Sequence, residues 1–401
     1  MIVVLAGCGA PPSSPAGRIS VPVPVSGDTS SPDSNQPILQ FIQMTDTHSG
    51  WGITSQTGRL LRTADAGETW QDVTPAVEMA RDTASAFLDA QTAFIEGFNE
   101  DQQSNTNGTL YATHDGGRAW AAYPLPFAGG SLQFLDAMNG YALTVPWGSG
   151  TGAATAGILY HTADGGKTWS QMPLRDPSGN PPAGAPPGSI SLEQGAALKI
   201  QTPGNFWLGG GLITANQSVS LQASRDGGQS WQTQSAGLPL TEDLPPTQMT
   251  VSLPVFVDPT NGFFTAAFTL TAVDGSNPRQ VMAFFATHDG GKSWAPLPAI
   301  VSGVRPSVRA DFVSPMDAYI PCGQAVCSTH DGGATWNALP SNVTFDANRV
   351  LTRLDFLDPQ TGWAVTSAGL FRAIDGGKNW EQVKIAISAP AQQGNLPTPQ
   401  S

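Results

Sequence analysis

The sequence predicts an all-β fold, a seven-bladed β-propeller in which each blade is a four-stranded antiparallel sheet. The composition is the first observation: the 401 residues include 45 Gly and 34 Pro, and only 12% are charged. Such a chain suits strands and tight turns better than long helices. The second is a nine-residue motif that recurs seven times, and the third is a strand–turn–strand pattern before each copy. Repetition of one small antiparallel unit is typical of a propeller.

The recurring motif has Asp at its fourth place, Gly at its sixth and Trp at its ninth, as in the sequence ATHDGGKSW of residues 286–294. The Asp closes a turn by accepting backbone N–H bonds, and the Gly supplies a positive φ. The Trp buries a large aromatic surface where the next strand begins. We therefore interpret each copy as a structural hairpin. The conserved places are Asp65, Asp115, Asp164, Asp226, Asp289, Asp331 and Asp375, and Trp70, Trp120, Trp169, Trp231, Trp294, Trp336 and Trp380.

A second pattern places an aromatic residue seven positions after an apolar one, with turn-forming residues between them. It predicts the first two strands of each repeat, and a β-rich run before the motif predicts the third. The Trp of the motif opens the fourth strand. The pairs are Met44/Trp51, Phe87/Phe94, Phe134/Tyr141, Ile200/Trp207, Phe256/Phe263, Phe312/Tyr319 and Phe356/Trp363.

On these residues, the nine-residue motifs resemble the Asp-box, or BNR, repeats of sialidases, sortilins and xyloglucanases. The full repeat is similar to that of the photosystem II stability and assembly factor-like propellers, with residues 356–380 as the best copy. The resemblance spans residues 38–385. It implies a role in assembling or stabilising a membrane protein complex, without implying a photosynthetic host. Because the matching residues are framework residues, the resemblance specifies fold more than function.

The N-terminal residues predict a cellular location. The run Leu5-Ala-Gly-Cys8 resembles the lipobox of bacterial lipoproteins, which implies a lipid on Cys8 and a location on the extracytoplasmic side of the cell membrane. We expect residues 1–8 to be the remnant of a signal, 9–37 a disordered Pro/Ser/Gly tether, 38–385 the propeller and 386–401 a disordered tail. The leader is short and lacks a basic region, which suggests a start further upstream. The alternative is a chance apolar start on a cytosolic protein.

The other two cysteines, Cys322 and Cys327, are expected to form a disulfide if Cys8 carries lipid. A two-residue turn at Gln324 and Ala325 would place them directly opposite each other as a non-hydrogen-bonded pair, at a separation that a disulfide accepts. The alternative is two reduced, buried thiols. Two cysteines without further ligands nearby do not make a zinc site.

Insertions predict where a ligand would bind. In a four-stranded meander, the loops between the second and third strands emerge on the same face as the links between blades, opposite the Asp boxes. These segments are longest in repeats two to five, so that face is the candidate binding surface. Its candidate residues are Glu100, Asp101, Trp147, Glu242 and Asp243. The alternative is that the loops are inert cover.

The remaining features favour a binding protein over an enzyme. A formal net charge of -13 argues against nucleic acid as a partner. No cofactor or metal motif is present, because four of the five His residues belong to four separate repeats. No Tyr–Glu pair of the sialidase kind is recognisable. We expect a monomeric, non-catalytic scaffold that binds a protein or a membrane protein complex. The alternative is a glycan-acting enzyme or a lectin that uses the same face.

Overall fold

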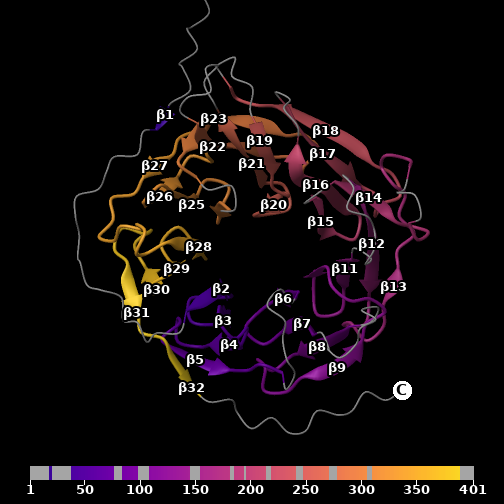
Figure 1. The fold of residues 1–401 in the computed structure, drawn as a ribbon, viewed down its shortest axis with the longest axis horizontal. Helices are drawn as coiled ribbons and strands as arrows, with labels where there is room; N and C mark the ends of the chain where they lie inside the picture. Colours follow the sequence, from indigo (N-terminus) through magenta and orange to yellow (C-terminus); the bar gives the residue numbers. More distant parts are fainter. Residues whose placement is uncertain are drawn as a thin grey trace, which may run out of the picture.

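The computed structural model describes residues 18–19, 38–75, 84–97, 108–144, 154–180, 185–193, 196–213, 218–240, 247–270, 278–304 and 309–388. Seven blades follow one another around a ring, and the chain passes through them in sequence order (Figure 1). These residues form strands and turns only, so the predicted all-β propeller is confirmed. Over the same ranges, no helix is long and apolar enough to cross a membrane.

Each blade contains an antiparallel meander of four strands that runs from the middle of the ring to its rim. In blades one to three these are β2 (Leu39–Met44), β3 (Gly50–Thr54), β4 (Leu60–Thr63) and β5 (Thr69–Asp72); β6 (Ser85–Phe87), β7 (Ala93–Gly97), β8 (Thr109–Thr113) and β9 (Ala121–Pro124); and β10 (Ser131–Phe134), β11 (Gly140–Thr144), β12 (Ala154–Thr162) and β13 (Ser170–Gln171).

Blades four to seven repeat the arrangement, and the Asp-box hairpin joins the last two strands every time. Their strands are β15 (Ala196–Thr202), β16 (Asn205–Ile213), β17 (Ser218–Ser224) and β18 (Gln232–Gly237); β20 (Val255–Phe256), β21 (Gly262–Leu270), β22 (Arg279–Thr287) and β23 (Ala295–Ser302); β24 (Asp311–Phe312), β25 (Ala318–Cys322), β26 (Ala325–Thr329) and β27 (Asn337–Ala338); and β28 (Leu351–Phe356), β29 (Gly362–Thr366), β30 (Gly369–Ala373) and β31 (Glu381–Val383).

Two of the long links between blades contain strands that the sequence patterns do not predict. β14 (Ile190–Glu193) pairs with the first half of β12, and β19 (Thr247–Val251) pairs with both β16 and β21. β19 thereby joins blades four and five into one sheet. The physical reason is that β12, β16 and β21 are each nine residues long. Their extensions leave backbone groups unpaired, and an added strand satisfies them.

The two ends of the chain also add strands to outer edges. β32 (Ala386–Ser388) pairs in parallel with β5, so the expected disordered tail begins with a strand that returns to blade one. β1 (Arg18–Ile19), within the expected tether, pairs in parallel with β23. An outer strand presents a row of unpaired backbone groups, which is why a nearby segment can add to it without any sequence periodicity of its own.

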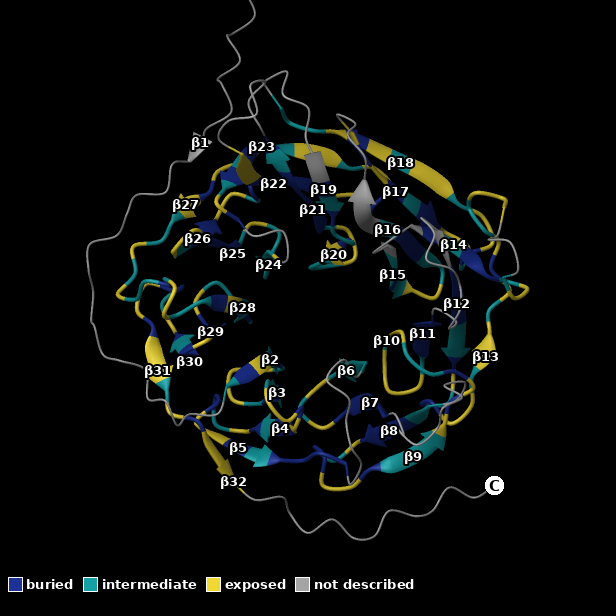
Figure 2. Ribbon diagram, in the orientation of Figure 1, coloured by how far each residue is buried: buried dark blue, intermediate teal, exposed yellow. Residues whose placement is uncertain are grey.

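Neighbouring blades pack through the aromatic residues of the second pattern. Each aromatic residue on a second strand meets the apolar residue on the first strand of the next blade, as Tyr319 stacks on Phe356 with ring centroids 3.6 Å apart. Similar contacts are Trp51–Phe87, Phe94–Phe134, Trp207–Phe256 and Phe263–Phe312. The buried residues therefore form layers between blades (Figure 2). The seven-residue spacing between the apolar and the aromatic residue therefore predicts which residues pack between blades, as well as the first two strands.

Candidate functional site

The Asp boxes use both carboxylate oxygens inside the hairpin. In blade five, Oδ1 of Asp289 accepts bonds from the N–H groups of Lys292 at 2.9 Å and Ser293 at 3.0 Å, and from the Thr287 hydroxyl at 2.7 Å. Its Oδ2 accepts the Ser293 hydroxyl at 2.6 Å. These donors, the Ser293 hydroxyl first, hold the pKa of Asp289 well below its usual range. The same arrangement recurs at Asp65, Asp164, Asp226 and Asp331.

Each box also docks on the first turn of its own blade. In blade five the Gly290 N–H donates to the Thr260 carbonyl at 2.9 Å, and Asp258 caps that turn by accepting the N–H groups of Thr260 and Asn261. Gly290 and Gly291 both have positive φ, which explains the paired glycines. The boxes and the first turns therefore lie on one face of the ring. The seven aspartates belong to seven separate blades, as expected for framework residues.

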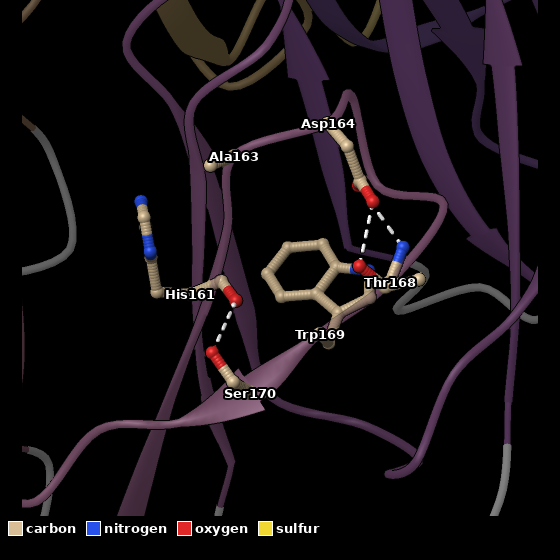
Figure 3. A pocket seen from close by; sticks show the side chains of 6 residues that line it. All are labelled: His161, Ala163, Asp164, Thr168, Trp169 and Ser170. Carbon is tan, nitrogen blue, oxygen red and sulfur yellow. Dashed lines mark hydrogen bonds between the residues drawn. The ribbon is translucent and has the colours of Figure 1, made fainter.

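Only four of the seven box tryptophans are fully buried. Trp70, Trp120, Trp336 and Trp380 lie in the core. Trp169, Trp231 and Trp294 are partly exposed. A shallow hollow of about 250 Å³ forms beside Trp169, lined by His161, Ala163, Asp164, Thr168, Trp169 and Ser170 (Figure 3).

The polar groups of this hollow bond to one another. Asp164 accepts the Thr168 N–H and hydroxyl at 3.0 and 2.6 Å, and the Ser170 hydroxyl donates to the His161 carbonyl at 3.4 Å (Figure 3). The Trp169 indole N–H donates to the Gly166 carbonyl at 3.1 Å. Asp164 is the one carboxylate in the lining, and its hydrogen bonds hold its pKa at about 2. The hollow therefore lacks the second carboxylate that glycoside hydrolysis uses.

The predicted binding residues Glu100, Asp101, Trp147, Glu242 and Asp243 lie outside the described residues, as does Cys8. The strands that lead to their segments are described. β12, β16, β21 and β22 are each nine residues long, whereas β25, β26, β29 and β30 are each five. Blades three to five are therefore taller than blades six and seven, and β19 braces two of them.

One acidic residue at the base of this face has a structural role. The Glu96 side chain, at the end of β7, is 2% exposed and accepts the Gly129 N–H at 2.6 Å. Burial raises its pKa, against the effect of that hydrogen bond. Glu96 thus fastens the link between blades two and three.

Cys322 and Cys327 are joined by a disulfide, with their Cα atoms 5.8 Å apart. The expected register is wrong. Cys322 lies opposite Ala325, and Ile320 lies opposite Cys327, so the two cysteines are diagonal neighbours. The turn begins one residue earlier than expected because Gly323 adopts a φ of 65°.

Sequence reasoning missed a set of residues on the innermost strands, which Figure 2 shows nearest the middle of the ring. We call the residue immediately before each apolar residue of the second pattern an inner-ring position. Each lies opposite the aromatic residue of the second strand. The seven positions are Gln43, Ala86, Gln133, Lys199, Val255, Asp311 and Asp355. Five of the seven are polar, which is the sequence signal that could have revealed them.

Four inner-ring side chains bind the open backbone edge of the next blade. Asp355 accepts the Met44 N–H at 2.6 Å, and Asp311 accepts the Phe356 N–H. Gln133 bonds both the N–H of Ile200 and the carbonyl of Leu198, and Gln43 donates to the Phe87 carbonyl at 3.0 Å. An innermost strand has no neighbour on its inner side, so these side chains supply partners that its backbone would otherwise lack.

The two inner-ring carboxylates are electrostatically unusual. Burial raises the pKa of Asp311 to about 7 and that of Asp355 to about 6, although each accepts a backbone hydrogen bond. Both remain partly in contact with water. Arg353 lies close enough to lower both pKa values, and its Nε donates to the Ile42 carbonyl at 2.9 Å. Raised pKa values suit a general acid, but here both carboxylates hold strands.

Among the described residues, no group of three or more His, Cys, Asp or Glu side chains is arranged to hold a metal ion. His288 bonds Asn261 and His330 bonds Asp317, each at 2.7 Å within its own blade. The fold and the boxes together define an Asp-box seven-bladed β-propeller.

Comparisons with known proteins agree with that class. No protein-family model matches the chain, and no curated protein matches it. Among solved structures, it is similar to YCF48 from Cyanidioschyzon merolae, at 16% identity and a TM-score of 0.49, over 86% of this chain and 97% of that one. It is also similar to the GH74 xyloglucanase from Xanthomonas campestris, at 14% identity and a TM-score of 0.54, over 89% and 55% of the two chains.

A third similar structure is an ancestral GH74 enzyme, at 13% identity and a TM-score of 0.51, over 87% of this chain and 47% of that one. The chain thus spans about half the length of the two GH74 enzymes. The two GH74 structures support the predicted propeller fold. At these identities the likeness assigns no activity.

Proposed function

We propose that this protein is a non-catalytic scaffold that binds a protein or a membrane protein complex through the face opposite the Asp boxes. We further propose that it is a monomer held on the extracytoplasmic side of a membrane by lipid on Cys8. The main support is the use of its carboxylates. Asp289 and its box counterparts, Glu96, Asp311 and Asp355 all accept backbone N–H bonds that hold the framework.

The shape of the ring supports the choice of face. The strands of blades three to five are long and extend toward the candidate loops, and β19 links two of these blades. Rigid elements that support variable loops are the usual way in which a fold presents binding residues.

The disulfide supports the proposed location. Disulfides persist in oxidising compartments outside the cytosol. With Cys322 and Cys327 joined, Cys8 is the remaining cysteine of the three, which is the residue that the lipobox resemblance nominates.

The test is affinity purification of the anchored protein from membranes, with mass spectrometry of what co-purifies. We expect one protein complex to be recovered with the wild type and lost with Trp147→Ala or with the pair Glu242→Gln and Asp243→Asn. The matched control is Glu68→Gln, because Glu68 is an exposed acidic residue in the Asp box of blade one, on the opposite face. Recovery of the same proteins with every variant would refute the binding face.

A glycan-acting enzyme is the second candidate, and one observation favours it. Asp311 and Asp355 are close enough to influence each other's charge, and both have raised pKa values. Purified protein should then cleave an oligosaccharide, and Asp311→Asn or Asp355→Asn should abolish the cleavage. Hydrolysis that is lost in both variants would replace the scaffold proposal.

A further inference from the structure

The outer edge of β23 pairs with a strand from a distant part of the chain. β23 (Ala295–Ser302) is the fourth strand of blade five, and β1 (Arg18–Ile19) lies beside it in parallel at the rim of the ring (Figure 1). Arg18 is opposite Ile300, and Ile19 is opposite Val301. The edge of an outer strand offers unpaired backbone groups to an extended segment. This edge is therefore a docking surface for an extended peptide.

The sequence of β23 restricts where such a peptide can pair. β23 has eight residues, whereas the fourth strands of the other blades have two to six. Its first half contains Pro296 and Pro298, which have no N–H to donate to an added strand. Residues 299–302 include no proline, and β1 pairs within them. The docking surface is therefore the half of β23 that lies farther from the Asp box.

The sequence that follows β1 has the pattern of a strand. Ile19, Val21, Val23 and Val25 are β-branched residues at alternate positions, which is the period of a strand. The only other β-branched residue among residues 9–37 is Thr29. The part of the tether with the highest strand propensity thus begins at the residues that pair with β23.

We propose that residues 299–302 of β23 are the docking site of the chain's own N-terminal tether. Given the proposed lipid on Cys8, on which this second step rests, the pairing fixes the anchored end of the chain to the rim of blade five. Cys8 and Leu39, where β2 begins, are 31 residues apart, a reach of about 110 Å, whereas Cys8 and Arg18 are 10 apart, a reach of about 35 Å. The rim of blade five is then the part of the ring held to the membrane.

Disulfide trapping tests the docking itself. Arg18→Cys and Ile300→Cys place thiols on opposed residues of neighbouring strands, with Cα atoms about 4.8 Å apart, which a disulfide accepts. The matched control is Arg18→Cys with Ser235→Cys, because Ser235 is exposed on β18, the outer strand of blade four. Both pairs are made with Cys8→Ser.

We expect the first pair to close at least ~10-fold faster than the control pair, because docking raises the effective concentration of the two thiols. Equal rates would overturn the docking. A first pair that forms only crosslinked dimers would assign the edge to the tether of a second copy, and would overturn the assignment to the chain's own tether.

The length of the free tether is a second measurement. Because the disulfide leaves Cys8 as the one free thiol of three, the protein can be coupled through it to a maleimide lipid in a phosphatidylcholine bilayer. Neutron reflectometry then gives the distance of the protein layer from the bilayer. Ile19→Pro removes an N–H from β1, and Ser30→Pro is the same change outside β1.

Flexible chains of 10 and 31 residues span about 17 and about 31 Å on average. Ile19→Pro should therefore move the protein layer outward by about 15 Å, while Ser30→Pro leaves it in place. An unshifted layer in Ile19→Pro would overturn the fixed anchor point. Because the coupling is chemical, this result is independent of lipidation in cells, and a Cys8 that carries no lipid in cells would refute the proposed location alone.

Discussion

Replacing Asp311 by Asn should stabilise the protein at alkaline pH and leave its stability unchanged at acid pH. Asn keeps the carbonyl oxygen that accepts the Phe356 N–H, so the bond to blade seven survives. What changes is the charge. The native state holds the Asp311 proton up to about pH 7, whereas the unfolded chain releases it near the model value of 3.8. Ionisation therefore opposes folding as pH rises.

The size of the effect follows from that shift. A rise in pKa from 3.8 to about 7 is worth about 4 kcal/mol at full ionisation, at about 1.4 kcal/mol per pKa unit. Because the side chain keeps some contact with water, we expect about half of this, roughly 2 kcal/mol. The stabilising contribution of the protonated group is complete below pH 3.8 and is lost as pH rises through about 7.

Urea unfolding of wild type and Asp311→Asn at about pH 4, 6 and 8 measures this directly. The free-energy difference should grow from near zero to about 2 kcal/mol in favour of the variant. Asp226→Asn is the control with the opposite sign, because hydrogen bonds hold the pKa of Asp226 at about 2. That variant should be destabilised at pH 6 and at pH 8 alike. An Asp311→Asn protein that is less stable than wild type by the same amount at every pH would refute the reasoning.

Three further changes test the framework. Phe356→Ala removes a ring that is 5% exposed and stacked on Tyr319, and it should cost about 3–5 kcal/mol in urea unfolding; a cost below about 1 kcal/mol would contradict the junction packing. The pair Cys322→Ala and Cys327→Ala opens a short loop and should cost about 2 kcal/mol, and reducing agent should then have no further effect. Truncation after Ile385 removes β32, which should lower the thermal midpoint and increase aggregation, as judged by light scattering; an unchanged midpoint would show that the strand contributes nothing.

The repeats could be predicted because each is a local unit. Asp289 bonds residues within four positions of itself, so nine consecutive residues determine the hairpin. The added strands could not be predicted in this way. β19 pairs with the edges that β16 and β21 leave open. β32 likewise pairs with the open edge of β5. Neither depends on a pattern in its own residues.

The candidate site likewise has parts that the local sequence predicts and parts that depend on contacts between distant segments. The number of cysteines predicts the pairing of Cys322 with Cys327. It does not predict their register, because the register depends on the φ of Gly323. Asp311 and Asp355 bond the Phe356 and Met44 N–H groups, each in the next blade. Only the closed ring brings these carboxylates to their partners. An alignment of the inner-ring positions could have revealed both carboxylates, since five of the seven positions are polar.

The pairing of β32 with β5 has a consequence for biosynthesis. The first blade leaves the ribosome with the outer edge of β5 uncovered, and that edge stays open until residues 386–388 have been made. During that interval the exposed edge can pair with another strand, including one from a second nascent chain. Synthesis of β32 is therefore the step that covers this edge, and chains that stop before Ala386 should associate with one another.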